Sequence, residues 1–396
     1  MAARAGARRA RTRAFIGAAA STLAFVALLA GCTASPTDVS TDGASATPQA
    51  DASVESILLP VITEQMEQMQ VPGLVAIVET SDGDSYEVAL GIADVETEEP
   101  MELSDHLRIG SITKTLTATV ILQLAEEGKL ALDDALAPYF PGVDTNGATI
   151  RQALNMTTGI PGYTGDAFMR EQAAEPQKVW TPDEIIAIVA GRPPTFAAGE
   201  GWEYSNTNYT MLGVIAEQVG GAPLGELIDE RIFTPLDMTG CSVPAADDTS
   251  IPSPRSHGYQ FGAYWDGEGT PPPMLDVTDW NMSWGFGTGE AICTVADVLI
   301  WVRALASGEL LDAATQAERL DWVSSGHPSV DYGLGIANLN GHIGHNGSIA
   351  GFQSQATVRE SDGTAIVVLA NLSVSPDLQT PATAISNAIS EALPAH

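Results

Sequence analysis

The sequence predicts an α+β fold in which strands from both ends of the chain form one sheet and a mainly helical lobe is inserted between them. Two observations lead to this prediction. Helical spacing of apolar residues dominates the middle of the chain. Strand-like apolar patterns lie near the beginning and near the end, at Gly73–Glu79, Tyr86–Val95, Tyr332–Leu339, Phe352–Arg359 and Ala365–Leu372.

The helical segments can be justified in order along the chain. Val54–Met69 places its apolar residues on one helical face, and Ser81–Asp84 has the composition of a hairpin turn between the first two strands. Thr380 is suited to cap a last helix whose first turn contains Pro381. Gly258–Thr288 has no clear period and is expected to form long loops. Helices are predicted at Val54–Met69, Thr113–Glu127, Ile150–Asn155, Pro182–Val189, Tyr209–Val219, Leu224–Ile232, Val295–Ala306 and Pro381–Leu393.

The charge balance excludes one broad class of function. The 396 residues contain 17 Lys and Arg against 50 Asp and Glu, for a formal net charge of −33. Five arginines and no acidic residue fall in the first 31 positions, so the rest of the chain is more acidic still. Nucleic-acid binding depends on Lys and Arg displacing counterions, so the composition excludes a nucleic-acid-binding protein. The same charge balance disfavours non-specific attraction to anionic lipid surfaces.

The first 31 residues have the pattern of an export signal. Five arginines precede Ala14–Ala30, an uncharged apolar run that is rich in alanine. A transmembrane helix is the alternative, but the run is at the short end of the spanning range. The residues Leu29-Ala30-Gly31-Cys32 resemble the bacterial lipobox, in which the cysteine becomes a lipidated N-terminus after cleavage. This resemblance implies a lipoprotein held on the outer face of the cell membrane by Cys32.

The sequence therefore divides into three parts. Residues 1–31 are predicted to be a signal peptide, and residues 32–52, rich in Ser, Thr, Ala, Asp and Pro, a disordered tether. Residues 53–396 are predicted to be one folded domain. Its sheet lobe is expected over about 53–110 and 290–396, and its helical lobe over about 111–289.

Two cysteines remain if Cys32 is lipidated. Cys241 and Cys293 form an even pair in an oxidising exterior, where disulfides persist. A disulfide and two buried free thiols are equally compatible with the sequence.

Lysine is rare enough to be informative. The chain has only Lys114, Lys129 and Lys178, and Lys114 alone lies in an uncharged opening to an apolar helix, Ile109–Leu116. Burial lowers the pKa of a lysine, which can then act as a base. Ser111 lies one helical turn before Lys114 on the same face, at the positive end of the helix dipole. The pair predicts an activated serine nucleophile.

Two further segments carry polar groups that suit such a site. Tyr204 and Asn206 directly precede an apolar helix. A phenol near a lysine cation can lose its proton well below its usual pKa, and Asn206 offers a donor and an acceptor to a substrate amide. The alternatives are an ordinary loop tyrosine and a helix-capping asparagine.

The second segment, Gly344–Ser348, joins two predicted strands. Its glycines allow a close approach of backbone N–H groups to an oxyanion, and a plain hairpin turn is the alternative. His342 and His345 are three residues apart, but a metal pair is less favoured than one structural and one site histidine, and no metal or cofactor is expected. Two roles are open for Trp284, which is expected either to line the substrate cleft or to pack within a loop.

Taken in order, these elements resemble the serine β-lactamase and penicillin-binding-protein superfamily, especially class C-type enzymes and exported actinobacterial D-Ala-D-Ala carboxypeptidases. The resemblance covers about residues 53 to 390. It rests on Arg108–Lys114, Thr149–Pro161, Glu203–Gly213, Ile232–Thr239, Asp276–Thr294, Tyr332–Ile336 and Gly344–Phe352.

The resemblance implies a β-lactamase/transpeptidase-like fold with an antiparallel sheet flanked by helices. It implies that Ser111 is acylated, that Lys114 and Tyr204 share the proton transfers, and that Asn206 holds the substrate amide. The backbone N–H groups of Ser111 and Ser348 would then form the oxyanion hole. The resemblance implies that His345, Asn346 and Gly347, with Ser348, bind the substrate, and His345-Asn346-Gly347 stands where most relatives have Lys-Thr-Gly. Asn346 departs from the Thr that usually helps to hold a substrate carboxylate.

The expected function is a serine hydrolase that forms an acyl-enzyme intermediate, resembling D-Ala-D-Ala carboxypeptidases that act on cell-wall peptides. Two alternatives share the fold, a class C-like β-lactamase and an esterase. An alternative of another class is a non-catalytic wall-binding or penicillin-sensing lipoprotein. The protein is expected to be a lipid-anchored monomer that binds a small-molecule or peptide substrate. In so acidic a domain, binding of a carboxylate requires local cations such as Lys114, His345 or Arg255, and without them neutral esters or amides are favoured.

Overall fold

The structure is a computed structural model that describes residues 54–264 and 269–393. The predicted signal peptide (1–31), the lipidation site Cys32 and the predicted tether (32–52) lie outside the described residues.

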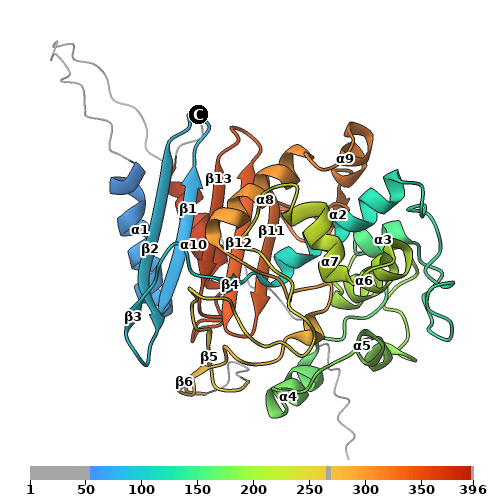
Figure 1. The fold of residues 1–396 in the computed structure, drawn as a ribbon, viewed down its shortest axis with the longest axis horizontal. Helices are drawn as coiled ribbons and strands as arrows, with labels where there is room; N and C mark the ends of the chain where they lie inside the picture. The colour runs from blue at the N-terminus through green and yellow to red at the C-terminus, as the bar shows by residue number, and fades with distance from the viewer. Residues whose placement is uncertain (1–53, 265–268, 394–396) are drawn as a thin grey trace, which may run out of the picture. The chain divides into compact units, whose positions relative to one another are not determined.

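A nine-stranded antiparallel sheet is built from the two ends of the domain (Figure 1). The strand order is β3-β2-β1-β13-β12-β11-β10-β9-β8, so β1, from early in the chain, pairs with β13, from late in the chain. Leu74 pairs with Ala370 at one end of this junction and Glu79 with Ala365 at the other. The strands of this sheet are β1 Gly73–Glu79, β2 Ser85–Asp94, β3 Glu99–Pro100, β8 Val323–Ser324, β9 Val330–Tyr332, β10 Ala337–Leu339, β11 His342–Ile349, β12 Phe352–Arg359 and β13 Ala365–Ala370. The predicted fold class is confirmed.

Two short antiparallel strand pairs lie outside this sheet among the described residues. The pairs are β4 Leu107–Arg108 with β7 Ile292–Cys293, and β5 Tyr259–Phe261 with β6 Met274–Asp276. The first pair helps to position Ser111, because β4 leads directly into the segment that contains this residue.

Helices cover both faces of the sheet and fill the inserted lobe. They are α1 Val54–Met69, α2 Thr113–Glu126, α3 Ile150–Leu154, α4 Asp166–Ala174, α5 Pro182–Val189, α6 Asn206–Gly220, α7 Leu224–Ile228, α8 Val295–Ser307, α9 Ala313–Arg319 and α10 Pro381–Ala392. Short turns of helix are η1 Gly110–Ile112, η2 Asp229–Phe233 and η3 Ser283–Gly285.

Alternation along the central strands divides the core into two layers. In β1, Leu74 and Ala76 pack with α1 and α10 on one face of the sheet. Val75 and Ile77 face the other side, where α8 and the inserted lobe form the larger core. Helix α2 lies inside this larger core and is buried continuously from Thr113 to Leu122.

The sequence predictions fail where local pattern and tertiary packing disagree. The strand predicted over Tyr332–Leu339 is broken into β9 and β10, because Gly335 has φ +78° and a Cβ there would lie 2.1 Å from Ala118 in α2. The predicted loop Gly258–Thr288 contains β5, β6 and η3. Helices α4 and α9 were not predicted because few of their residues are apolar and buried.

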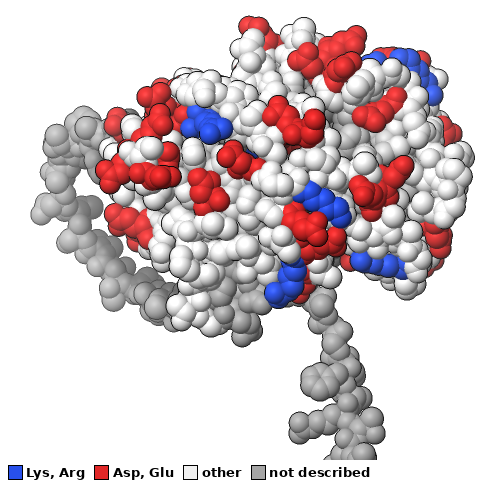
Figure 2. All heavy atoms as spheres, turned by 60° about the horizontal axis from the view of Figure 1, so that its bottom comes forward, with Lys and Arg blue, Asp and Glu red and all other residues white. Residues whose placement is uncertain are grey.

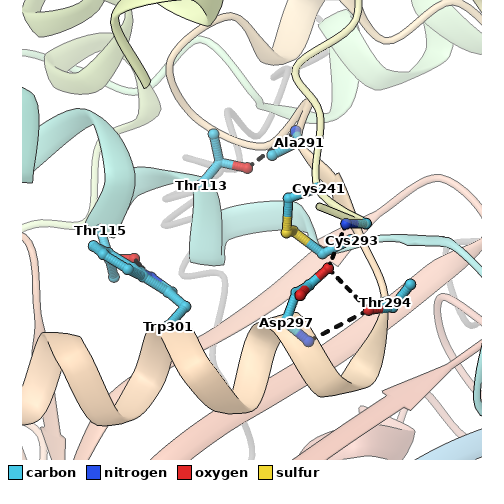
Figure 3. Close-up of a disulfide and its surroundings, with 9 residues drawn as sticks. Thr113, Thr115, Cys241, Ala291, Cys293, Thr294, Asp297 and Trp301 are labelled. Carbon is cyan, nitrogen blue, oxygen red and sulfur yellow. Dashed lines mark hydrogen bonds between the residues drawn. A yellow bond between two sulfur atoms is a disulfide. The ribbon is translucent and has the colours of Figure 1, made fainter. Parts of the chain in front are cut away.

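A disulfide joins Cys241 to Cys293, with their Cα atoms 4.1 Å apart (Figure 3). Cys293 belongs to β7 and pairs with Leu107 of β4. The disulfide therefore ties the chain after η2 to the strand pair that introduces Ser111. Beside it, the side chain of Asp297 accepts a 2.7 Å hydrogen bond from the backbone N–H of Gly240.

The surface retains the acidic character of the sequence. Figure 2 shows one face, on which Asp and Glu side chains are widely spread and Lys and Arg side chains are few. Within residues 54–264 and 269–393, none of the helices has both the length and the apolar character needed to cross a membrane.

Candidate active site

The segment that carries Ser111 is pressed against strand β11 by two glycines. Gly110 has φ +52°, and a Cβ at this position would lie 2.7 Å from the backbone nitrogen of Ser348. A Cβ on Gly347 would lie 2.9 Å from the backbone nitrogen of Ser111. Ser354 holds the same turn by donating a 2.6 Å hydrogen bond to the Ile109 carbonyl. The glycines therefore bring the backbone N–H groups of Ser111 and Ser348 close together.

Lys114 lies one turn after Ser111 and is fully buried. Its Nζ is 2.9 Å from the Ser111 Oγ and 2.9 Å from the carbonyl oxygen of Thr288. Among the described residues, Lys114 has no carboxylate at ion-pair distance. Burial holds the pKa of Lys114 well below its usual 10.5, and the more distant Glu290 carboxyl opposes this shift in part. The neutral amine is the form that can take a proton from Ser111.

The loop behind Lys114 is held by polar contacts to its backbone. Thr117 of α2 donates a 3.0 Å hydrogen bond to the Gly287 carbonyl, and Tyr163 donates a 2.5 Å bond to the Trp284 carbonyl. Glu290 accepts bonds from the backbone N–H groups of Gly287 (2.8 Å) and Gly289 (3.1 Å). These contacts fix the Thr288 carbonyl that Lys114 uses.

Glu290 was missed by the sequence analysis. It is 5% exposed and is the single charged residue between Asp279 and Asp297. A charged residue inside an uncharged segment is the same signal that identified Lys114, so it could have been found.

The ring of Tyr204 covers Lys114, with the Nζ 5.0 Å from the ring centroid. Burial of the hydroxyl raises the pKa of Tyr204 above its usual 10, and its hydrogen bond with Ser111 opposes this only in part. The prediction that a lysine cation lowers this pKa is therefore wrong, because the buried lysine itself favours its neutral form. Of the two groups, Lys114 is the better base and Tyr204 stays protonated at neutral pH.

Asn206 begins helix α6, three residues before the predicted start. Ser205 takes the extended capping conformation, so Asn206 does not cap the helix. Its Nδ2 donates a 2.9 Å hydrogen bond to the Thr164 Oγ1. Its Oδ1 is buried without a hydrogen-bond partner among the described residues.

Gly344–Ser348 is part of strand β11 and not a turn between strands, which corrects the prediction. His345 pairs with Ala356 and Ser348 with Gln353 along the full β11–β12 ladder. A continuous strand forms despite Gly344 and Gly347 because both pack directly against backbone atoms of neighbouring segments. Alternate residues face opposite sides of a strand, so His342 and His345 diverge. The Nε2 of His342 lies 2.9 Å from the Ser390 Oγ in α10, whereas His345 faces Lys114 and Tyr204.

His345 does not supply a cation to the site. Its Nδ1 is 2.5 Å from the Asn346 carbonyl, which can only accept, so Nδ1 carries the proton. Its Nε2 then accepts the hydrogen bond of the Tyr332 hydroxyl at 2.9 Å. Burial, and secondarily the neighbouring Lys114, lower the pKa of His345 to about 4. The imidazole is neutral at physiological pH.

Asn346 and Arg255, which the sequence analysis also considered, make no hydrogen bond to Ser111, Lys114 or Tyr204 among those found between the described residues. The side chain of Asn346 makes no hydrogen bond to a described residue, and it leaves β11 on the face opposite His345. The backbone of Arg255 pairs with that of His106 in an isolated parallel β-bridge. The structure thus brings together Ser111, Lys114 and Tyr204 without a permanent positive charge.

A cavity of about 310 Å³ opens beside Asn206 and Ser348. Its walls are largely apolar and include Met169 of α4, Phe261, Trp280, Trp284 and Ile349. None of the residues that line it is charged. The sequence left two roles open for Trp284, lining a cleft or packing in a loop, and in the structure this residue lines the cavity.

Three polar atoms of this wall are buried without hydrogen-bond partners among the described residues. They are the Nε2 of Gln172, the Nε1 of Trp284 and the Oδ1 of Asn206. A buried polar atom without a partner is costly, so these three atoms lower the stability of the wall.

Comparison with known proteins places these features in context. The family model described as beta-lactamase matches residues 60–389. A penicillin-binding protein of Bacillus subtilis (strain 168) is 26% identical over 68% of this chain and 61% of its own length. Esterase EstB of Burkholderia gladioli is 29% identical over 64% of this chain and 63% of its own. This chain therefore spans less than two thirds of the length of these curated relatives.

Among solved structures, a D-stereospecific amidohydrolase from Streptomyces sp. has 32% sequence identity and a TM-score of 0.72. The match covers 84% of this chain and 97% of that protein.

Proposed function

Because the chain belongs to the beta-lactamase family of serine hydrolases, we propose that it cleaves neutral amides or esters through an acyl intermediate on Ser111. The observation that carries this proposal is the 2.9 Å contact between the Ser111 Oγ and the Nζ of a buried Lys114 whose pKa is lowered. Such a pair is a nucleophile with its own base.

In the first step, neutral Lys114 takes the proton of Ser111 while the Oγ attacks the substrate carbonyl. The electron pair moves to the carbonyl oxygen, which the N–H groups of Ser111 and Ser348 stabilise. One such donor is commonly worth about 3 kcal/mol in the transition state.

The intermediate then collapses and the leaving group departs with a proton. Tyr204 is suited to donate this proton because its hydroxyl stays protonated and lies beside Ser111. The Lys114 ammonium, whose Nζ lies over the Tyr204 ring, returns a proton to the phenol. Water, activated by the same pair, hydrolyses the ester and regenerates Ser111.

The electrostatics of the site favour an uncharged substrate. A carboxylate needs a nearby cation, but His345 is neutral above pH 4 and burial disfavours the charge on Lys114. The uncharged and largely apolar cavity beside Asn206 suits an apolar acyl substituent. The matched relatives include an esterase and an amidohydrolase, in agreement with this substrate class.

A D-Ala-D-Ala carboxypeptidase-like activity on cell-wall peptides is the second candidate, and the match to a penicillin-binding protein favours it. This activity requires recognition of a free C-terminal carboxylate. A β-lactamase activity would use the same nucleophile. The choice between these reactions depends on the product and not on the acylation step.

The experiment that tests the proposal has two stages. A fluorescent acyl phosphonate or penicillin should label the wild-type protein and Ser104→Ala, a variant of an exposed serine, but not Ser111→Ala. Labelling that persists in Ser111→Ala would remove Ser111 as the nucleophile.

Product analysis then compares a peptide amide, a small ester, a peptide ending in D-Ala-D-Ala and a chromogenic cephalosporin. We expect kcat/KM to be highest for the amide or ester. Preferential release of D-Ala from the free acid would establish the second candidate instead.

We further propose that the protein is anchored outside the cytoplasm through Cys32. The proposal is based on the apolar run and lipobox-like residues of the sequence, and the Cys241–Cys293 disulfide is typical of an oxidising compartment. Wild-type protein should incorporate labelled fatty acid and sediment with membranes. A Cys32→Ser variant that still incorporates the label would contradict this proposal.

A further inference from the structure

Glu290 is a buried acidic residue close to the site but outside the direct contacts of Ser111. It is 5% exposed, and among the described residues it forms no ion pair. Its two carboxyl oxygens accept hydrogen bonds from Gly287 and Gly289, the residues on either side of Thr288. Burial raises the pKa of Glu290, and these backbone hydrogen bonds oppose that shift by stabilising the carboxylate.

Lys114 approaches the same three-residue segment through the carbonyl of its central residue. The Lys114 Nζ donates to the Thr288 oxygen at 2.9 Å, while Glu290 holds the flanking N–H groups. A single peptide segment therefore links the base to the carboxyl. Since charges in a dry interior interact more strongly than in water, the carboxylate acts on Lys114 across this segment.

Glu290 is the one acidic side chain that acts on the charge of Lys114 among the described residues. The other titratable groups around the lysine are Tyr204 and Tyr209, whose rings lie 5.0 and 5.8 Å from its Nζ, and His345. All three are neutral at physiological pH. Among the described residues, Glu290 is therefore the acidic side chain positioned to stabilise an ammonium at Lys114.

We propose that Glu290 is a positioning residue that stabilises the Lys114 ammonium formed when Lys114 takes the Ser111 proton, and that it holds the Thr288 carbonyl against this ammonium. The inference rests on the proposed acylation of Ser111. In its neutral form, Lys114 gains little from the carboxylate. After proton transfer, the new ammonium interacts with both the Thr288 carbonyl and Glu290. An interaction that strengthens as the reaction proceeds accelerates it.

Glu290→Gln tests this inference because the amide retains one acceptor oxygen and removes the charge. The second-order rate of labelling by a neutral acyl phosphonate is measured against pH. On the acidic side of this pH–rate profile the rate falls because the neutral base is lost. We expect this acid limb to move to lower pH by about one unit. The plateau rate should fall about tenfold because a weaker base is left. A rate that falls without movement of the acid limb would overturn the inference.

Asp297→Asn is a matched control. Asp297 is also a buried acidic side chain that accepts a backbone hydrogen bond, from Gly240 at 2.7 Å. It lies beside the disulfide (Figure 3), whereas the hydrogen bonds of Lys114 go to Ser111 and Thr288. Its loss should lower the melting temperature and leave the acid limb in place. If the acid limb of the pH–rate profile moved equally in both variants, the shift would reflect a general loss of stability and not the charge of Glu290.

A measurement on the wild-type protein keeps the inference testable if Glu290→Gln does not fold. The chain has three lysines, so a sample with ¹³C-labelled lysine side chains gives few signals to assign. The Lys114 Cε signal should move twice with pH, once as the lysine titrates and once as Glu290 takes up its proton. A single transition would overturn the inference.

Failure of this inference can be told apart from failure of the proposed function. Labelling that survives in Ser111→Ala refutes the proposed nucleophile, whatever Glu290 does. Labelling that disappears in Ser111→Ala, together with an unmoved acid limb in Glu290→Gln, refutes the role of Glu290 alone.

Discussion

The two ends of helix α2 place the same kind of side chain in opposite surroundings. At the first turn, Lys114 is fully buried and its Nζ contacts a hydroxyl and a carbonyl. Just past the last turn, Lys129 is 43% exposed and pairs with Glu127 at 2.7 Å. Burial lowers the pKa of Lys114 far from its usual value, while solvent screens the charge of Lys129. The environment, and not the residue type, makes one lysine a base and leaves the other a surface cation.

The sharpest test of this comparison replaces each lysine by methionine, which keeps much of the volume. Lys114→Met should lower the acylation rate about a thousandfold, since general-base catalysis commonly contributes about 10²–10⁴-fold. Lys129→Met should leave the rate unchanged. Stopped-flow labelling with an acyl phosphonate measures both. Comparable losses in the two variants would mean that burial is not what distinguishes the lysines.

A second test removes the disulfide near the start of α2. Reduction of the Cys241–Cys293 disulfide, or the double substitution Cys241→Ser and Cys293→Ser, frees β7 beside the strand that leads to Ser111. For a bridge that spans 52 residues, the chain-entropy model predicts a loss of about 4 kcal/mol in the free energy of unfolding. Urea denaturation with and without reductant measures this loss. A change below about 1 kcal/mol would show that packing alone holds this region.

His345 gives a third test, because it is buried on the same side as Lys114. Its pKa is about 4 in the folded protein and 6.5 when unperturbed, so the unfolded chain binds its proton first as the pH falls. The stability contribution of the neutral imidazole is complete above pH 6.5 and is lost as the pH falls towards 4, by about 3 kcal/mol. Denaturation curves between pH 7 and 4 should be less steeply pH-dependent in His345→Gln. Equal slopes would contradict the neutral, buried assignment.

The smallest effect is expected at the other end of the helix. Arg231 and Lys129 both bind Glu127 and hold its pKa at about 2. This cluster is partly exposed, so Arg231→Gln should destabilise the protein by less than about 1 kcal/mol. Thermal unfolding at low and high salt measures the effect, which should shrink with salt. If Arg231→Gln lowered the free energy of unfolding as much as loss of the disulfide does, the exposed end of α2 would matter as much for stability as the buried end, contrary to the comparison.

Much of the fold could be predicted because local pattern and final packing agree. Val54–Met69 and Phe352–Arg359 form a helix and a strand at the predicted bounds. The failures have one cause. The break at Gly335 is imposed by Ala118 from a helix more than 200 residues earlier, and Asp166–Ala174 is a polar helix that buries little more than Phe168 and Gln172. Neither contact has a local signature.

The site divides in a similar way. Ser111 and Lys114 could be paired from the sequence because helical spacing brings them together within one turn. Tyr204 approaches them from a distant segment, and its pKa shift was predicted with the wrong sign because the burial of its hydroxyl is a property of the assembled site. The Gly344–Ser348 segment was expected to be a turn because its glycines resemble one, and the neighbouring backbone makes it a strand.

By itself, the sequence determined the class of fold, the serine–lysine pair and the acidic balance of the chain, because periodicity, spacing within one helical turn and charge are local or additive properties. Only the tertiary structure decided which groups are charged. It buried Lys114 and His345, left the buried Asn206 Oδ1 without a partner among the described residues, and placed Glu290 against the backbone N–H groups on either side of Thr288. The reason is that the cost of a charge depends on the solvent it loses and on the dipoles that replace it, and both are fixed only when distant segments meet.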